Sequence, residues 1–197
     1  MKAEDIIEHL NYLPDTLASK HLQIFLNDLY LSRSVPPTGN SNEILKFLET
    51  RLFKVKNSGQ SHNLYKLVSQ LPRGKRWEIW RRWQVEYELI RRQDKKACEF
   101  INEESKTNSQ NFWQMGRVFC LSIEGKKDQS EFMLDLIKSR GFEDQIFEVL
   151  FQSIYDKGDI VEINNKKNKI QPLHIVMMDT LKIRLKANYI AHLGIEY

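Results

Sequence analysis

Two successive stretches of the chain share one plan, and this repeat restricts the fold more than any other feature. Residues 73–104 and 111–141 each contain a long aromatic-rich helical pattern, a short turn and a second helical pattern. The turns read Asp94-Lys95-Lys96 and Lys126-Lys127-Asp128, and Glu-Phe pairs follow at Glu99-Phe100 and Glu131-Phe132. A helical hairpin repeated in this way cannot bury its apolar face alone, so it stacks on its neighbours. We therefore predict an all-α fold of consecutive antiparallel helical hairpins, stacked as a short α-solenoid like the TPR-type α/α superhelix.

The rest of the chain reads as further helices separated by clear terminators. The strongest terminator is SVPPTGNSN at 34–42, where two prolines and a glycine precede cap-forming residues. In the first part of the chain, helices are predicted at 4–13 and 16–31, followed by a third helix capped by Ser41 or Asn42 and a short fourth helix that runs through Leu71. Further helices are predicted at 75–92, 95–104 and 111–124, and the next one ends at Gly141. The last two predicted helices run from 146 to near 158 and from Pro172 to Leu181. A short terminal helix is expected at 187–193. The predicted organisation is a helical array at 1–157, an exposed loop at 158–171 and capping helices at 172–197, within a single domain.

Apolar residues at helical spacing indicate which faces are buried. In the predicted helix 75–92, one face gathers Ile79, Trp80, Trp83, Tyr87 and Ile90, while Val85 and Leu89 lie nearly opposite. This wide apolar girth is typical of an inner helix with neighbours on two sides. In the predicted helix 16–31, the expected buried face consists of Leu17, Leu22, Phe25, Leu26 and Leu29. In the predicted helix that ends at Gly141, it consists of Phe132, Met133, Leu136 and Ile137.

The two cysteines, Cys98 and Cys120, lie on helices that flank a turn near residues 105–109. If those helices are antiparallel, residues at equal distance from the turn face one another, and the two cysteines satisfy this condition to within about one helical turn. They could form a disulfide in an oxidising compartment. The alternative is a pair of small buried thiols in a reducing compartment.

No motif indicates catalysis or metal binding. The five histidines, His9, His21, His62, His174 and His192, do not pair at helical spacing, and the sequence contains no HExxH or CxxC motif. Gly-rich phosphate loops, GxSxG elbows and a Cys-His-Asn order are also absent. We predict that the protein is not an enzyme and uses no cofactor or metal.

A basic and aromatic run, RGKRWEIWRRWQVEYELIRR, permits a second interpretation as a nucleic-acid-binding helix. The candidate residues are Arg76, Arg81, Arg82, Lys166, Lys167 and Lys169. Against it, the tryptophans share a face with isoleucines, and Glu78, Glu86 and Glu88 dilute the positive charge. The net charge of +4 is also modest for such a function.

No stretch of the sequence approaches the roughly 20 continuous apolar residues that a membrane span needs, so we expect none. We also do not expect MKAEDIIEHL to be a signal peptide, because acidic residues interrupt its apolar positions. The ordered landmarks of the chain nevertheless resemble those of uncharacterised helical-repeat proteins exported by alphaproteobacteria. The landmarks are YLPDTLASKHLQIFLNDLYLS (12–32), PP-x-G (36–39), LP (71–72), AC (97–98), FWQ…VFC (112–120), Gly125, LDLIKSRG (134–141) and PLHIVMM (172–178). The resemblance covers most of the chain and matches both cysteines, so it favours the disulfide. It implies a periplasmic or cell-envelope location, whereas a native start at Met1 would indicate the cytoplasm.

These observations together favour a helical scaffold that binds another protein over a cytosolic nucleic-acid-binding module. Tyr87, Arg91 and Arg92 are the predicted partner-binding anchors, because exposed aromatic and arginine side chains often dominate protein interfaces.

Overall fold

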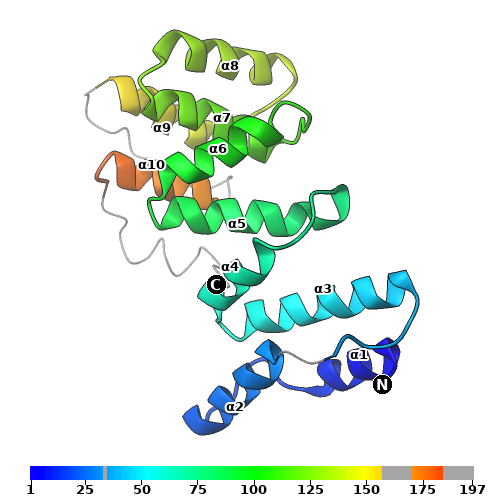
Figure 1. The fold of residues 1–197 in the computed structure, drawn as a ribbon. Coiled ribbons are helices and arrows are strands. Elements are labelled where there is room, and N and C mark those ends of the chain that lie inside the picture. The colour runs from blue at the N-terminus through cyan, green and yellow to red at the C-terminus, as the bar shows by residue number, and fades with distance from the viewer. Residues whose placement is uncertain (33–34, 157–169, 184–197) are drawn as a thin grey trace. The chain divides into compact units, whose positions relative to one another are not determined.

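The computed structural model describes residues 1–32, 35–156 and 170–183, and in these residues the regular elements are helices (Figure 1). They are α1 (Ala3–Tyr12), α2 (Lys20–Leu31), α3 (Ser41–Asn57), α4 (Ser61–Val68), the 3-10 turn η1 (Lys75–Trp77), α5 (Glu78–Ile90), α6 (Asp94–Glu104), α7 (Asn111–Ile123), α8 (Lys127–Ser139), α9 (Gln145–Tyr155) and α10 (Pro172–Thr180). The predicted all-α class is confirmed. Residues 158–169 of the predicted loop and the predicted helix at 187–193 lie outside the described residues.

The helices divide into two compact units, and the division falls within α5, between Arg81 and Arg82. The first unit contains α1 to α4, and the second contains α6 to α10. The predicted organisation as one domain with an array, a loop and a cap stays a prediction.

In the first unit, α3 packs against α1, α2 and α4. Its N-terminus is fixed by Asn40, whose side chain accepts hydrogen bonds from the backbone N–H groups of Asn42 (3.0 Å) and Glu43 (3.1 Å). The Glu43 carboxylate in turn accepts from the backbone N–H of Asn40 (3.0 Å), which completes a capping box. The prediction that Ser41 or Asn42 caps this helix is therefore wrong, because the chain becomes helical directly after Asn40.

α2 begins at Lys20 rather than at residue 16, because α3 holds the preceding segment outside a helix. The Lys54 ammonium of α3 donates to the backbone oxygen of Leu13 (2.6 Å) and to the Asp15 carboxylate (2.9 Å). Asn57, one turn later, donates to the other oxygen of Asp15 (3.0 Å). Lys54 and Asn57 thus hold the connection between α1 and α2 against α3.

The core of the second unit surrounds α7, which packs against α6, α8 and α9 (Figure 1). Its side chains are buried over most of the helix, and Trp113, Val118 and Phe119 have no exposed surface. Gly116 is required where α6 comes closest, because a Cβ atom there would lie 3.1 Å from Cδ1 of Ile101. The packing of α7 on α8 agrees with the second predicted hairpin.

Two predicted apolar faces are partly wrong. In α5, Ile79 is 60% exposed and Ile90 is 41% exposed, whereas the buried face combines Trp80, Val85 and Leu89 with two polar residues. Those residues, Gln84 and Glu88, are buried, although polar side chains usually lie on an exposed face. A second error concerns α8, where Phe132 is 68% exposed while Met133 and Ile137 are buried. Sequence spacing alone misplaced the centre of each buried face.

Five helices end in the same backbone motif, in which a residue with positive φ follows the last turn. These residues are Gly59, Arg92, Gly125, Gly141 and Lys182, with φ between 57° and 86°. After α7, for example, the N–H of Gly125 donates to the Ser122 oxygen (3.1 Å) and the N–H of Lys126 donates to the Leu121 oxygen (3.0 Å). The predicted terminators Gly125 and Gly141 are confirmed. Arg92 occupies this position although it is not glycine.

A buried polar contact joins α9 to α10. The Asp144 side chain caps α9 by accepting from the N–H of Phe147 (3.1 Å), and its second oxygen lies 3.1 Å from Nε2 of His174, which has no exposed surface. Nε2 of His174 makes no regular hydrogen bond among the described residues, so this second contact is an electrostatic one. Nδ1 of His174 accepts from the N–H of Gln171 (3.1 Å). Burial alone would raise the pKa of Asp144, but His174 and the backbone N–H groups of Phe147 and Ile146 together lower it.

We expect Asp144→Asn to destabilise the protein at pH 7 by about 1–2 kcal/mol, because asparagine keeps the helix cap but removes the charge facing His174. A lowered pKa in the folded state means that the carboxylate stabilises the protein above the ordinary aspartate pKa of about 3.9. That stabilisation is lost as the pH falls through the folded-state pKa. Urea unfolding from pH 7 to pH 3 should therefore show the difference between wild type and variant shrinking with acid. A difference that is constant across this range would contradict the assignment.

Candidate binding surface

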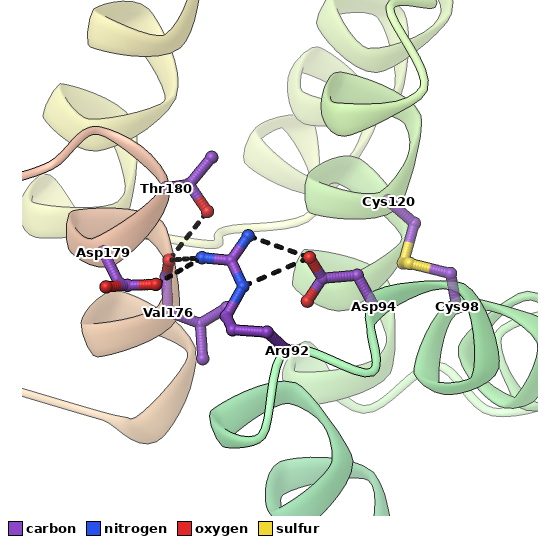
Figure 2. Close-up of polar contacts among 7 residues, drawn as sticks. All are labelled: Arg92, Asp94, Cys98, Cys120, Val176, Asp179 and Thr180. Carbon is purple, nitrogen blue, oxygen red and sulfur yellow. Dashed lines mark hydrogen bonds and ion pairs between the residues drawn. A yellow bond between two sulfur atoms is a disulfide. The ribbon is translucent and has the colours of Figure 1, made fainter.

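Arg92, one of the predicted partner anchors, binds within its own unit (Figure 2). Nη2 of its guanidinium lies 2.8 Å from Asp94 at the start of α6, and Nη1 lies 2.7 Å from Asp179 in α10. Burial alone would lower the pKa of Arg92, but the hydrogen bonds and charges of the two aspartates raise it. These bonds occupy the groups that a partner would contact, which reduces what Arg92 offers to another protein.

The other two predicted anchors, Tyr87 and Arg91, contact each other at the end of α5, and Tyr87 also stacks on Trp83. The Tyr87 ring stacks on Trp83, with centroids 5.4 Å apart and planes inclined by 20°, and the Arg91 guanidinium lies 5.5 Å from the centre of the Tyr87 ring. Arg91 is exposed, whereas Tyr87 is half-buried. Their role in partner binding stays a prediction.

The candidates for nucleic-acid binding are partly neutralised by carboxylates. Arg76 pairs with Glu49 (2.8 Å), and Arg82 pairs with Glu86 (2.9 Å) while its guanidinium lies 4.5 Å from the centre of the Phe112 ring. Arg81 is half-buried, and Lys166, Lys167 and Lys169 lie outside the described residues. Two of the predicted phosphate-binding arginines therefore already have anionic partners.

The structure places Cys98 of α6 and Cys120 of α7 together as the sequence suggested, with the sulfur atoms 2.00 Å apart and the Cα atoms 5.6 Å apart. Both side chains are buried, at 4% and 0% exposure. The pair joins α6 to α7 beside the Arg92 contacts (Figure 2). The prediction that the two cysteines can form a disulfide is confirmed at the level of geometry.

Sequence reasoning missed an exposed apolar stripe on α2. Leu22, Phe25 and Leu29 lie on one face at helical spacing and are 56%, 69% and 43% exposed. Leu26 and Tyr30, on the neighbouring face, are buried. The sequence feature that could have revealed the stripe is the large number of apolar residues around this helix. The sequence spacing instead led us to assign these residues to one buried face. We name Leu22, Phe25 and Leu29 the α2 stripe.

Leu29 of the α2 stripe also lines a pocket of about 340 Å³ within the first unit. The pocket lies among α1, α2 and α3, and its apolar lining includes Ile6 and Leu10 of α1, Leu29 of the stripe and Phe47 of α3. Two basic side chains, His9 and Arg51, also line it. The Arg51 Nε donates to the backbone oxygen of Tyr30 (2.7 Å) and a terminal nitrogen donates to that of Ser32, so Arg51 holds the C-terminal end of α2.

The described part of the chain contains no group of three His, Cys, Asp or Glu residues arranged to hold a metal ion. In the same residues, no helix is long and apolar enough to cross a membrane.

Comparison of the chain with protein-family models, curated proteins and solved structures finds no match. The resemblance to exported helical-repeat proteins remains an expectation.

Proposed function

We propose that the protein is a non-enzymatic helical scaffold that binds an amphipathic helix of another protein on the α2 stripe. The observation that carries this proposal is the exposure of three large apolar side chains on one helix face, which soluble proteins rarely leave uncovered as a continuous patch. The i, i+3 and i+7 spacing of Leu22, Phe25 and Leu29 suits a helical partner, because two apolar helix faces interdigitate at this spacing.

The architecture that we propose for this scaffold is a short α-solenoid. Packing of successive helices on their neighbours, such as α6 on α7 and α7 on α8, supports it. A stacked array of this kind offers long surfaces to partners.

We also propose that the scaffold works in an oxidising compartment, such as the bacterial cell envelope. The positions of Cys98 and Cys120, with Cα atoms 5.6 Å apart, support this location, because this separation permits a disulfide and disulfides persist in such compartments but are rare in the cytosol. The nucleic-acid alternative gains no comparable support, since Arg76 and Arg82 pair with carboxylates.

We expect Phe25→Asp to weaken partner binding by about 30-fold or more, because a charge would replace the most exposed member of the stripe. Phe132→Asp is the matched control, since Phe132 on α8 is exposed to almost the same extent (68% against 69%) but lies outside the stripe. A photo-crosslinking phenylalanine analogue in place of Phe25 identifies the partner in the native source, and mass spectrometry of the crosslinked peptide locates the contact.

Support requires a crosslink to a helical segment of another protein, with affinity lost in Phe25→Asp and kept in Phe132→Asp. Circular dichroism checks that both variants remain folded. The proposal fails if the analogue captures no protein, if it captures only a second copy of this chain, or if the captured partner binds Phe25→Asp normally.

A further inference from the structure

The pocket in the first unit combines an apolar lining with a basic side chain, Arg51, that has no carboxylate partner within the described part of the chain. We propose that this pocket binds a free alkyl carboxylate, with the hydrocarbon chain among α1, α2 and α3 and the carboxylate on Arg51. This inference goes beyond the proposed function, because it concerns a small molecule and does not require that the α2 stripe binds a protein.

The size and lining of the pocket fit a medium-length alkyl chain. The pocket has a volume of about 340 Å³, and its lining is mostly apolar. Leu10 and Phe47 form well-buried walls, at 9% and 8% exposure, while Ile6 and Leu29 are more accessible. Small-molecule sites are commonly apolar pockets of about 300–1,000 Å³ with a few polar groups that set the orientation.

Arg51 supplies the charge that selects an anion. Among the described residues, its hydrogen-bond partners are the backbone oxygens of Tyr30 and Ser32, and no carboxylate lies within ion-pair distance. Both carbonyl partners are neutral, so the positive charge of the guanidinium is not balanced locally. Burial lowers the pKa of Arg51, because it removes water from around the charged guanidinium. A bound carboxylate would balance this charge through an ion-paired hydrogen bond, whereas a neutral head group would leave the charge unbalanced and a cationic head group would be repelled.

His9 lies at the same pocket and has one nitrogen already engaged. Its Nδ1 contacts the backbone oxygen of Asp5, one helical turn earlier. The ring is exposed, so it lies where the polar end of a ligand would meet solvent. Neither basic residue of the pocket faces an acidic side chain of the lining.

The experiment compares decanoate, decanol and decylamine by isothermal titration calorimetry below their aggregation concentrations, using the full chain. We expect decanoate to bind about tenfold or more tightly than the other two. Methyl NMR should show the largest shifts at Ile6, Leu10 and Leu29. Equal affinity for all three compounds, or no binding of decanoate, would overturn the proposal.

Three variants assign the preference to the pocket. Arg51→Gln should lower decanoate affinity to that of decanol, whereas Arg51→Lys should keep part of the preference. Ile6→Trp should fill the pocket and abolish binding without removing packing, which keeps the test decisive if Arg51→Gln does not fold. Arg140→Gln, which removes an exposed arginine in the second unit, should leave the affinity unchanged. Decanoate binding that survives both Ile6→Trp and Arg51→Gln, or binding only to oleate-containing vesicles, would overturn the assignment.

Discussion

Phe119→Ala is expected to destabilise the second unit by about 3–5 kcal/mol, since removing a fully buried aromatic ring leaves a cavity that neighbouring helices fill only in part. Phe119 has no exposed surface and lies in α7, the helix on which α6, α8 and α9 pack. Loss of its ring therefore affects several helix contacts at once. Urea unfolding, monitored by tryptophan fluorescence, measures the change.

Phe132→Ala is the control, because it removes the same ring from α8, where the side chain is 68% exposed. A surface substitution of this kind usually changes the free energy of unfolding by no more than about 0.5 kcal/mol. Similar losses in the two variants would show that α7 is not the centre of the core.

Replacing both cysteines by alanine is expected to destabilise the protein by about 3 kcal/mol, mainly because the unfolded chain would gain freedom. The bond closes a loop between residues 22 positions apart, and the chain-entropy estimate for a loop of this length gives that magnitude. Denaturant unfolding of wild type, with and without reductant, and of the Cys98→Ala/Cys120→Ala variant measures the effect.

Reductant should lower the stability of wild type and leave the double variant unchanged. A free-thiol count on protein from its native source, with thiols trapped at lysis, then tests whether the bond forms in the cell. Two free thiols in that sample, or a wild-type stability that does not respond to reductant, would contradict the prediction and the proposed compartment.

The sequence predicted those parts of the structure that depend on local backbone chemistry. Gly125 and Gly141 end their helices because glycine adopts positive φ without a steric penalty. The symmetrical placement of Cys98 and Cys120 about a turn was enough to predict their proximity, because two antiparallel helices align residues at equal distance from the turn.

The sequence did not predict features that depend on contacts between distant segments. Arg92 meets Asp179 across 87 positions of the chain, and no local pattern specifies that pair. The α2 stripe was missed for a related reason, because helical spacing shows that residues share a face but not whether another helix covers it. Gln84 and Glu88 are buried, and their residue types did not indicate this, because polarity usually indicates solvent.

The covalent link between α6 and α7 means that the two parts of the chain would stay joined even if the turn between these helices were cut. The exposed Lys106 lies in that turn, between the two bonded cysteines. A protease cut after Lys106 would leave two fragments still joined through sulfur. The molecule would keep its mass apart from one added water, and the fragments would separate only on reduction.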